Sequence, residues 1–265
     1  MSVRASVLTG FGINCDYETA HALNRAGAEA SRVHLNDVIA DPGMLEDVQI
    51  LAVPGGFSFG DDIASGRILA NRLRYKLGDP LLRFVEAGKL IIGICNGFQV
   101  LAKMGILPLF DGKLEQITTV TYNDSARFED RWVHLAAAEG NRCIWLKGIK
   151  HLELPIRHGE GKFVPQDDEV LQELAEGGQI ALRYARPDGV PARGEYPANP
   201  NASVDDIAAI CDPSGRVLGI MPHPEAYVVR TNHPRWTRSN LPEEGAGLQV
   251  FRNAVAYCEE ALAVS

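Results

Sequence analysis

Residues 90–94, Leu-Ile-Ile-Gly-Ile, form a short run that is apolar at every position. A strand with one face in water would alternate apolar and polar residues, so this run predicts a strand that is covered on both faces. A glycine-flanked turn at 93–97 and helical spacing over 98–104 follow directly. A buried parallel strand that leads through a tight turn into a helix is typical of α/β proteins.

The segments before this run alternate in the same way. Strand-like runs occur at 3–9, 29–35 and 48–53, and helical spacing occurs at 17–26, 67–75 and 80–87. This alternation predicts a doubly wound, largely parallel sheet flanked by helices.

The pattern changes after about residue 109. Short strand-like runs follow one another at 116–122, 131–136, 143–146, 179–184, 207–211 and 217–221. They predict either an antiparallel β extension or the far half of the same sheet. Residues 187–203, with prolines at 187, 191, 197 and 200, predict a long loop that is either functional or simply mobile. A helix over 247–262 closes what we expect to be a single domain, 1–265.

Composition excludes several classes of function. The chain has 265 residues and a formal net charge of −8, which makes it a poor ligand for nucleic acid. The first residues are too polar for an export signal, and no window has the roughly 18 apolar residues of a membrane span. The five cysteines include no C-x-x-C pair, so neither disulfides nor a metal site is predicted, and a cytoplasmic location fits best.

The turn at 93–97 reads Gly-Ile-Cys-Asn-Gly. A nucleophile between two glycines, after a buried strand and before a helix, is the elbow pattern of α/β enzymes. Such a turn presents Cys95 at the carboxyl edge of the sheet, where the helix N-terminus favours a reactive thiolate. A buried cysteine in an ordinary turn fits the same five residues equally well.

A thiolate nucleophile needs a base, and the base needs a group to orient it. Among the seven histidines, His223 follows the apolar run 217–221 within Met-Pro-His-Pro-Glu. Side chains two residues apart on an extended segment point the same way, so Glu225 can hold one nitrogen of His223 while the other faces Cys95. A rigid proline turn with solvated charges is the alternative.

Acyl transfer also needs N–H donors for the developing oxyanion. Pro54-Gly55-Gly56-Phe57 follows the strand-like run 48–53, and its glycines let backbone N–H groups approach a ligand. The N–H of Asn96, directly after the nucleophile, is the second expected donor. Seen alone, Pro54-Gly55-Gly56-Phe57 is equally compatible with a simple turn.

Together these stretches resemble the class I, or triad, glutamine amidotransferases. More narrowly, the chain resembles the glutaminase subunits of phosphoribosylformylglycinamidine synthase, an enzyme of purine synthesis, nearly from end to end. The stretches that carry the resemblance are GINCDYE (12–18), PGGFSFGDD (54–62), GICNGFQVLAKMGILP (93–108), NDSARFEDRW (123–132), LPIRHGEGKF (154–163), ALRY (181–184), NPNAS (199–203) and GIMPHPEA (219–226).

The resemblance implies a role for each matching residue. It implies a nucleophile at Cys95, a base at His223 and an orienting carboxylate at Glu225. The implied oxyanion donors are Gly56 or Phe57, together with Asn96. Contacts to the substrate glutamine are implied for Gln99, Arg127 and Phe128, and a less defined role for His158 and Glu160. A surface ion-pair network is the alternative for Arg127, His158 and Glu160.

The implied reaction is glutamine hydrolysis through a γ-glutamyl thioester on the cysteine. Neither metal nor cofactor is expected in this chain, which has no Walker A motif, so ATP and Mg²⁺ are expected at a partner. The implied partners are a large synthetase subunit, which receives the ammonia and makes formylglycinamidine ribonucleotide, and a small third subunit. Weak glutaminase activity without these partners is also expected.

Two positions depart from the family pattern. Ala226 stands where an arginine usually follows His-Pro-Glu, and Ala202 replaces a glycine in NPNAS. The first puts a local ion pair or partner contact in doubt, and the second the loop conformation. The competing functions are a stand-alone cysteine hydrolase, peptidase or thiol stress protein on a similar fold, a non-catalytic subunit, and a glutaminase that feeds another pathway.

Overall fold

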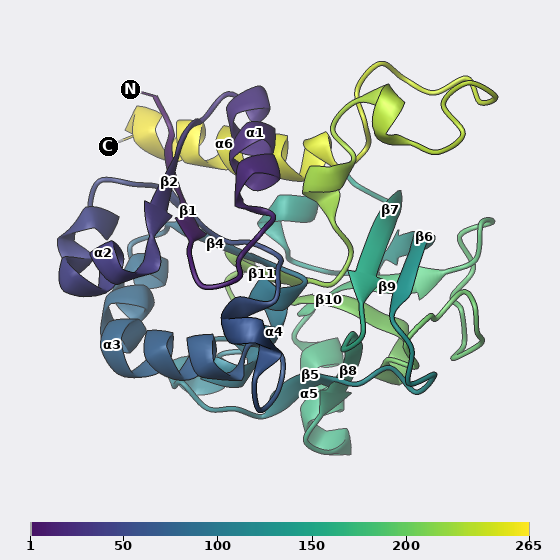
Figure 1. The fold of residues 1–265 in the computed structure, drawn as a ribbon, viewed down its shortest axis with the longest axis horizontal. Coiled ribbons are helices and arrows are strands. Elements are labelled where there is room, and N and C mark those ends of the chain that lie inside the picture. Colours follow the sequence, from purple (N-terminus) through teal and green to yellow (C-terminus); the bar gives the residue numbers. More distant parts are fainter. Residues whose placement is uncertain (1, 265) are drawn as a thin grey trace.

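The computed structural model describes residues 2–264, and one sheet of nine strands runs through it (Figure 1). Its order is β2-β1-β3-β4-β11-β10-β9-β6-β7, and β5 and β8 form a separate pair. The strands are β1 (Arg4–Thr9), β2 (Glu29–His34), β3 (Ile50–Val53), β4 (Leu90–Ile94), β5 (Thr118–Thr121), β6 (Glu129–Ala137), β7 (His151–His158), β8 (Lys162–Pro165), β9 (Ile180–Ala185), β10 (Ile207–Cys211) and β11 (Val217–Ile220).

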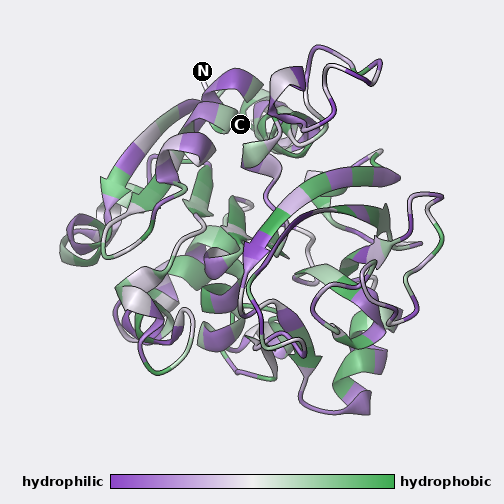
Figure 2. Cartoon of the chain, turned by 45° about the vertical axis from the view of Figure 1, so that its right-hand side comes forward, coloured by the Kyte–Doolittle hydropathy of each residue, from purple (hydrophilic) through white to green (hydrophobic). Residues whose placement is uncertain are grey.

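The sheet has a parallel and an antiparallel half, which confirms the predicted fold class. Strands β2, β1, β3, β4 and β11 pair in parallel, whereas β10, β9, β6 and β7 continue the sheet by antiparallel pairing. Every residue of β3, β4 and β11 is buried, as expected for strands covered on both faces. Figure 2 colours apolar residues green, and green appears on strands in the interior and on parts of the helices around them.

Helices cover the parallel half from both sides (Figure 1). Helix α1 (Asp16–Ala26) contacts α6 (Leu248–Val264), and α3 (Arg67–Glu86) contacts α4 (Asn96–Met104). The short α2 (Leu35–Ala40) follows β2, and α5 (Asp168–Glu176) follows β8. Within residues 2–264, no helix combines the length and apolar character needed to cross a membrane.

The prediction of two helices at 67–75 and 80–87 is wrong, because α3 is continuous and includes Pro80. A proline inside a helix costs about 3 kcal/mol, through a lost hydrogen bond and a steric clash. Leu73, Leu77 and Leu81 are nevertheless buried along one face on both sides of it. Because burying each such leucine contributes about 1.5–3 kcal/mol, packing outweighs the cost of the proline.

The predicted strand at 143–146 is also wrong. Residues Ile144–Leu146 form a single 3-10 turn, whose Trp145 ring is buried and donates from Nε1 to Arg216 O at 3.0 Å. The run is apolar because it packs beneath α6, with which it makes contact.

Strand β7 was not predicted, because Pro155 interrupts its apolar pattern and proline is excluded from strands paired on both sides. The structure places β7 at the end of the sheet, paired only with β6 among the described strands. Because β7 pairs on one side only, the missing N–H of Pro155 interrupts at most one row of sheet hydrogen bonds, and the proline is tolerated there. The short β8 and the helix α5 after it were missed as well.

The segment 187–203 is a loop, as predicted, but its last part is firmly packed. Asn199, Asn201 and Ser203 are buried, and Asn201 Nδ2 donates to Gly161 O at 2.8 Å. Ser203 Oγ accepts from Phe163 N at 2.9 Å. These bonds tie the end of the loop to residues 161–163, next to the site described below.

Candidate active site

Cys95 lies at the junction of β4 and α4, with φ 50° and ψ −104°. A non-glycine residue in such a sparsely populated backbone region costs on the order of 1–3 kcal/mol. Two backbone hydrogen bonds hold it there: Cys95 N donates to Ile220 O at 2.7 Å, and Gln99 N donates to Cys95 O at 3.1 Å. Neighbouring strand and helix thus fix the strained turn that the elbow pattern predicts.

Close packing under the elbow explains the glycine that follows the cysteine. A Cβ on Gly97 would overlap the carbonyl oxygen of Val53 in the neighbouring strand β3. Because that oxygen belongs to the backbone, it has little freedom to move away. Only glycine therefore lets the first turn of α4 lie directly on β3.

His223 lies just beyond β11 and is held at both its backbone and its ring. Its backbone N donates to Pro155 O of β7 at 2.8 Å, and its Nδ1 lies 2.6 Å from Glu225 Oε1. The exposed fractions of His223 and Glu225 are only 2% and 3%. The carboxylate accepts the proton of Nδ1, and this leaves Nε2 with the lone pair that a base needs.

Electrostatics stabilise the protonated form of this imidazole. Burial alone lowers the pKa of His223, but the Glu225 carboxylate, with smaller contributions from Cys95 and Cys15, raises it well above its ordinary value. The imidazolium that forms when a nearby thiol loses its proton is thereby stabilised. His223 Nε2 is buried and has no hydrogen-bond partner within residues 2–264, while the Cys95 Sγ lies 3.7 Å from Arg157 O of β7.

The two expected oxyanion donors on the first glycine-rich turn are not equivalent. Phe57 N already donates to Gly12 O at 2.9 Å, whereas Gly56 adopts φ 154° and passes close to the segment 12–14. A Cβ on Gly56 would lie 2.5 Å from Gly12 O, so this position requires glycine. The geometry therefore favours Gly56 over Phe57. The N–H of Asn96 belongs to the first turn of α4, where backbone donors have no partner within the helix.

Gln99 is buried one helical turn after Cys95, and both ends of its amide are engaged. Its Nε2 donates to Glu160 O at 2.6 Å, and its Oε1 accepts from Asn96 Nδ2 at 2.8 Å. Glu160 in turn accepts from Ser65 N at 3.3 Å, ahead of α3. In this state Gln99 therefore fastens the segment 158–161 to the elbow.

The remaining predicted residues divide into a buried and an exposed pair. His158 and Glu160 are buried, so a surface ion-pair network is wrong for both of them. Burial, together with the nearby His223, lowers the pKa of His158 to about 3 and keeps its ring neutral. Arg127 and Phe128 are exposed, and the Phe128 ring lies 6.4 Å from that of Phe57.

The sequence reading did not assign a role to Asn123 or Cys15, although both lie in the quoted stretches. Asn123 joins its own stretch to the segment 158–161: its Oδ1 accepts from Gly161 N at 2.9 Å and contacts His158 Nδ1 at 3.1 Å, and its Nδ2 donates to Arg127 O at 2.9 Å. The Cys15 thiol lies within 4.8 Å of a ring nitrogen of His223, and burial raises the pKa of this thiol. Only the fold brings residues so distant in the sequence together.

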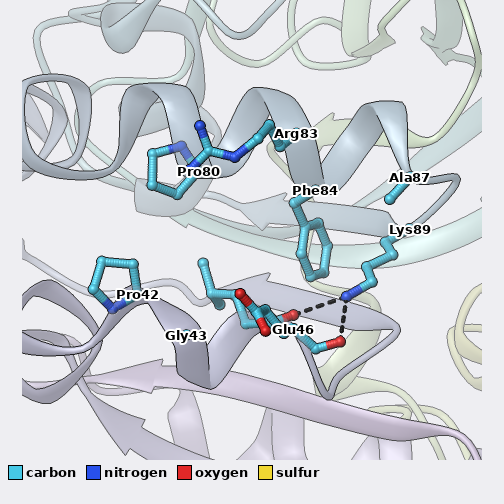
Figure 3. Close-up of a pocket in the computed structure, with 9 residues that line it drawn as sticks. Pro42, Gly43, Glu46, Pro80, Arg83, Phe84, Ala87 and Lys89 are labelled. Atoms are coloured by element: carbon cyan, nitrogen blue, oxygen red, sulfur yellow. Dashed lines mark hydrogen bonds between the residues drawn. The ribbon is translucent and has the colours of Figure 1, made fainter.

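A surface hollow between η1 (Pro42–Leu45) and α3 lies away from this site (Figure 3). Lys89 closes one end of the hollow, because its Nζ donates to Leu45 O at 2.9 Å and Glu46 O at 2.7 Å. Lys89 directly precedes β4, whereas Cys95 follows it. The hollow therefore lies at the opposite edge of the sheet from the elbow.

Comparison with known proteins places the chain in a class. A family model described as the CobB/CobQ-like glutamine amidotransferase domain matches residues 2–258. A solved structure from Thermoplasma acidophilum, described as that of a GMP synthase subunit, has the same fold; its TM-score is 0.57 at 14% identity, with all of this chain and 98% of that chain covered. The class defined by the sheet and by the family model is that of the glutamine amidotransferases.

More similar relatives narrow the class to one family. The phosphoribosylformylglycinamidine synthase subunit PurQ of Dehalococcoides mccartyi is 46% identical over 260 residues, which cover 97% of this chain and 98% of the relative. The PurQ of Methanococcus maripaludis strain S2 is 44% identical, with 95% and 96% covered. A chain in the structure of PurLQS from Thermotoga maritima has a TM-score of 0.72 at 31% identity, with 97% of this chain and all of that chain covered. The chain belongs to the PurQ family, the glutaminase subunits of phosphoribosylformylglycinamidine synthase in purine biosynthesis.

Proposed function

We propose that Cys95, His223 and Glu225 form the catalytic triad of this glutaminase. The observation that carries the proposal is a strained elbow at Cys95 together with a buried imidazole whose Nδ1 is held 2.6 Å from Glu225 Oε1. The pKa of this imidazole responds to Cys95, which links the two parts of the site. In the first step the thiolate attacks the side-chain amide carbon of glutamine. His223 holds the thiol proton and delivers it to the departing ammonia, which leaves a γ-glutamyl thioester. Water then hydrolyses the thioester to glutamate, with His223 as the base.

Backbone donors would stabilise the oxyanion in both steps. We assign this role to the N–H groups of Gly56 and Asn96, which come from neighbouring parts of the site. Removal of one such donor typically costs about 10²–10³ in rate. Binding of glutamine by Arg127 and Phe128 is part of the same proposal, since both are exposed at the loop that Asn123 ties to His158. Contact of Gln99 with the substrate requires it to exchange at least one of its present partners.

The ammonia passes to a partner synthetase, as the membership of the T. maritima chain in PurLQS supports. We propose that ATP and Mg²⁺ act on the synthetase and that this chain works in the cytoplasm without a cofactor of its own. The partner set consists of PurL, the large subunit, together with PurS, the small one. Exposed aromatic side chains at Phe57 and Phe128 lie where docking can reshape the site, which gives a physical reason for weak activity in isolation.

The test measures release of ammonia and glutamate from glutamine by the purified chain, with and without the cognate synthetase, ATP and formylglycinamide ribonucleotide. We expect strong stimulation by the complete partner set and complete loss of release in Cys95→Ala. Release that does not depend on the synthetase would favour a stand-alone hydrolase. Unchanged release in Cys95→Ala would contradict the triad.

A further inference from the structure

The Cys15 thiol has no part in the proposed reaction, although it lies beside the base. One ligand atom from each of Cys15, His223 and Glu225 can be chosen so that all three lie within 4.8 Å of one another. Cys15 is half-buried and follows the segment 12–14, which packs against Gly56. Its Sγ contacts Asn14 Oδ1 at 3.3 Å.

Two buried polar atoms of this cluster lack partners. Within residues 2–264, neither His223 Nε2 nor Glu225 Oε2 makes a hydrogen bond. An unpaired buried carboxylate oxygen is costly, and a cation would relieve that cost. The role proposed for His223 as a base explains why its Nε2 has no partner. That role does not explain why Glu225 Oε2 has none.

The donor set indicates the kind of cation. A thiolate, an imidazole nitrogen and one carboxylate oxygen are the ligands of Zn²⁺ and of similar thiophilic ions, whereas Mg²⁺ and Ca²⁺ need several oxygens. Tetrahedral Zn²⁺ with bonds of about 2.0–2.3 Å places its ligand atoms roughly 3.3–3.8 Å apart. The three candidate atoms lie within 4.8 Å of one another, so shifts of about 1.5 Å or less bring them to this spacing. Where Nδ1 is the ligand nitrogen, its 2.6 Å bond to Glu225 Oε1 opens to admit the ion.

We propose that Cys15, His223 and Glu225 form an inhibitory site for a thiophilic divalent cation such as Zn²⁺. Binding releases the thiol proton of Cys15 to solvent and occupies the imidazole. Because the loss of activity follows from the role of His223 as the base, that part of the inference rests on the proposed function. The binding itself does not.

Three alanine variants of the full chain test the site. Cys15→Ala removes the proposed ligand, Cys95→Ala removes the nucleophile, and Cys258→Ala removes a buried cysteine on α6 as the matched control. Binding is measured by titration with Co²⁺, whose absorption reports a thiolate ligand, and by competition with Zn²⁺. Circular dichroism confirms that each variant is folded.

We expect wild type, Cys95→Ala and Cys258→Ala to bind one Co²⁺ with thiolate absorption. Cys15→Ala is expected to lose this absorption and to bind Zn²⁺ at least about tenfold more weakly. Mg²⁺ at the same concentrations should compete with neither ion. Binding that survives in Cys15→Ala and disappears in Cys95→Ala would place the ion on the nucleophile and overturn the proposal, as would the absence of binding in the wild type.

Inhibition is measured separately, as glutamate release by each variant in complex with the synthetase. We expect Cys15→Ala to require at least about tenfold more Zn²⁺ for half-inhibition of the activity that it shows without the ion. Effects of Zn²⁺ on the synthetase are common to wild type and variant, so they cancel in this comparison. Equal sensitivity of the two would refute inhibition through Cys15. If instead the proposed triad is wrong, Co²⁺ binding still depends on Cys15 while activity does not depend on Cys95.

Discussion

Replacement of Glu225 by glutamine isolates the contribution of one charge to catalysis. The substitution keeps the size of the side chain but removes the charge that lies 2.6 Å from His223 Nδ1. Both partners are almost fully buried, so water cannot replace the lost interaction. A hydrogen bond to a charged group contributes about 1.5–3 kcal/mol, which corresponds to a loss of roughly 10–100-fold in rate.

The tautomer of His223 adds to this loss. A glutamine amide can donate to Nδ1, which moves the ring proton to Nε2 and removes the lone pair that faces the thiol. The corresponding change in a serine protease triad lowers kcat by about 10⁴. We therefore expect Glu225→Gln to lower kcat for glutamine hydrolysis by between about 10² and 10⁴, with a smaller change in KM.

The assay is steady-state glutamate release by the complex with its synthetase. The matched control is Glu176→Gln on α5. Glu176 is exposed, and within residues 2–264 its carboxylate accepts only from Gln172 Nε2, at 2.7 Å. We expect this control to keep wild-type rates. If Glu225→Gln retains more than half of the wild-type kcat while folded, the orienting role of Glu225 is refuted.

Three further predictions concern the stability of the fold around the site. Ala202 has φ 62°, so Ala202→Gly should relieve about 1–2 kcal/mol of backbone strain in the folded chain. The greater conformational entropy of glycine in the unfolded chain offsets about 0.4–1 kcal/mol of this gain. Calorimetry should therefore show a Tm raised by a few degrees. Burial lowers the pKa of Lys103 from 10.5 to about 8 in the folded chain. Between pH 8 and pH 10.5 the unfolded chain therefore binds more protons than the folded chain. The free energy of unfolding should rise with pH over this window by on the order of 3 kcal/mol. The measurement is denaturant unfolding at several pH values across this range. In Lys103→Met the free energy of unfolding should not rise with pH, and a rise equal to that of the wild type would show that Lys103 is not its source. Gly97→Ala should fail to fold or lose several kcal/mol because of the Val53 carbonyl, whereas Gly159→Ala, whose Cβ meets only a ring atom at 3.9 Å, should unfold near the wild-type midpoint.

Local pattern was sufficient to predict the parallel strands β1 to β4, whereas the run that forms β11 was predicted as a strand but not placed beside β4. Strand β4 and the elbow after it are contiguous, so the residues that define them stand side by side in the sequence. The same holds for His223 and Glu225, which share one short segment. Periodicity failed where tertiary packing decides, as in α3, which continues through Pro80 because the leucines on both sides share one buried face.

The contacts between distant segments could not be predicted in this way. Asn123 bonds to Gly161 and His158, and Cys15 lies against His223, although no local pattern links these positions. Conversely, Ala202 occupies the left-handed conformation that its departure from glycine had put in doubt. The chain keeps the loop geometry because the hydrogen bonds of Asn201 and Ser203 hold the residues on either side.

The position of β11 in the sheet has a consequence for folding. This strand is the last of the described strands in the sequence, yet it lies between β4 and β10. Until residues 217–220 are synthesised, the apolar β4 has one unpaired edge, which can pair with another chain. His223 follows β11 by only a few residues, so the step that closes this edge also brings His223 into the site. A nascent or truncated chain that ends before β11 is therefore both prone to aggregate and unable to complete the proposed triad.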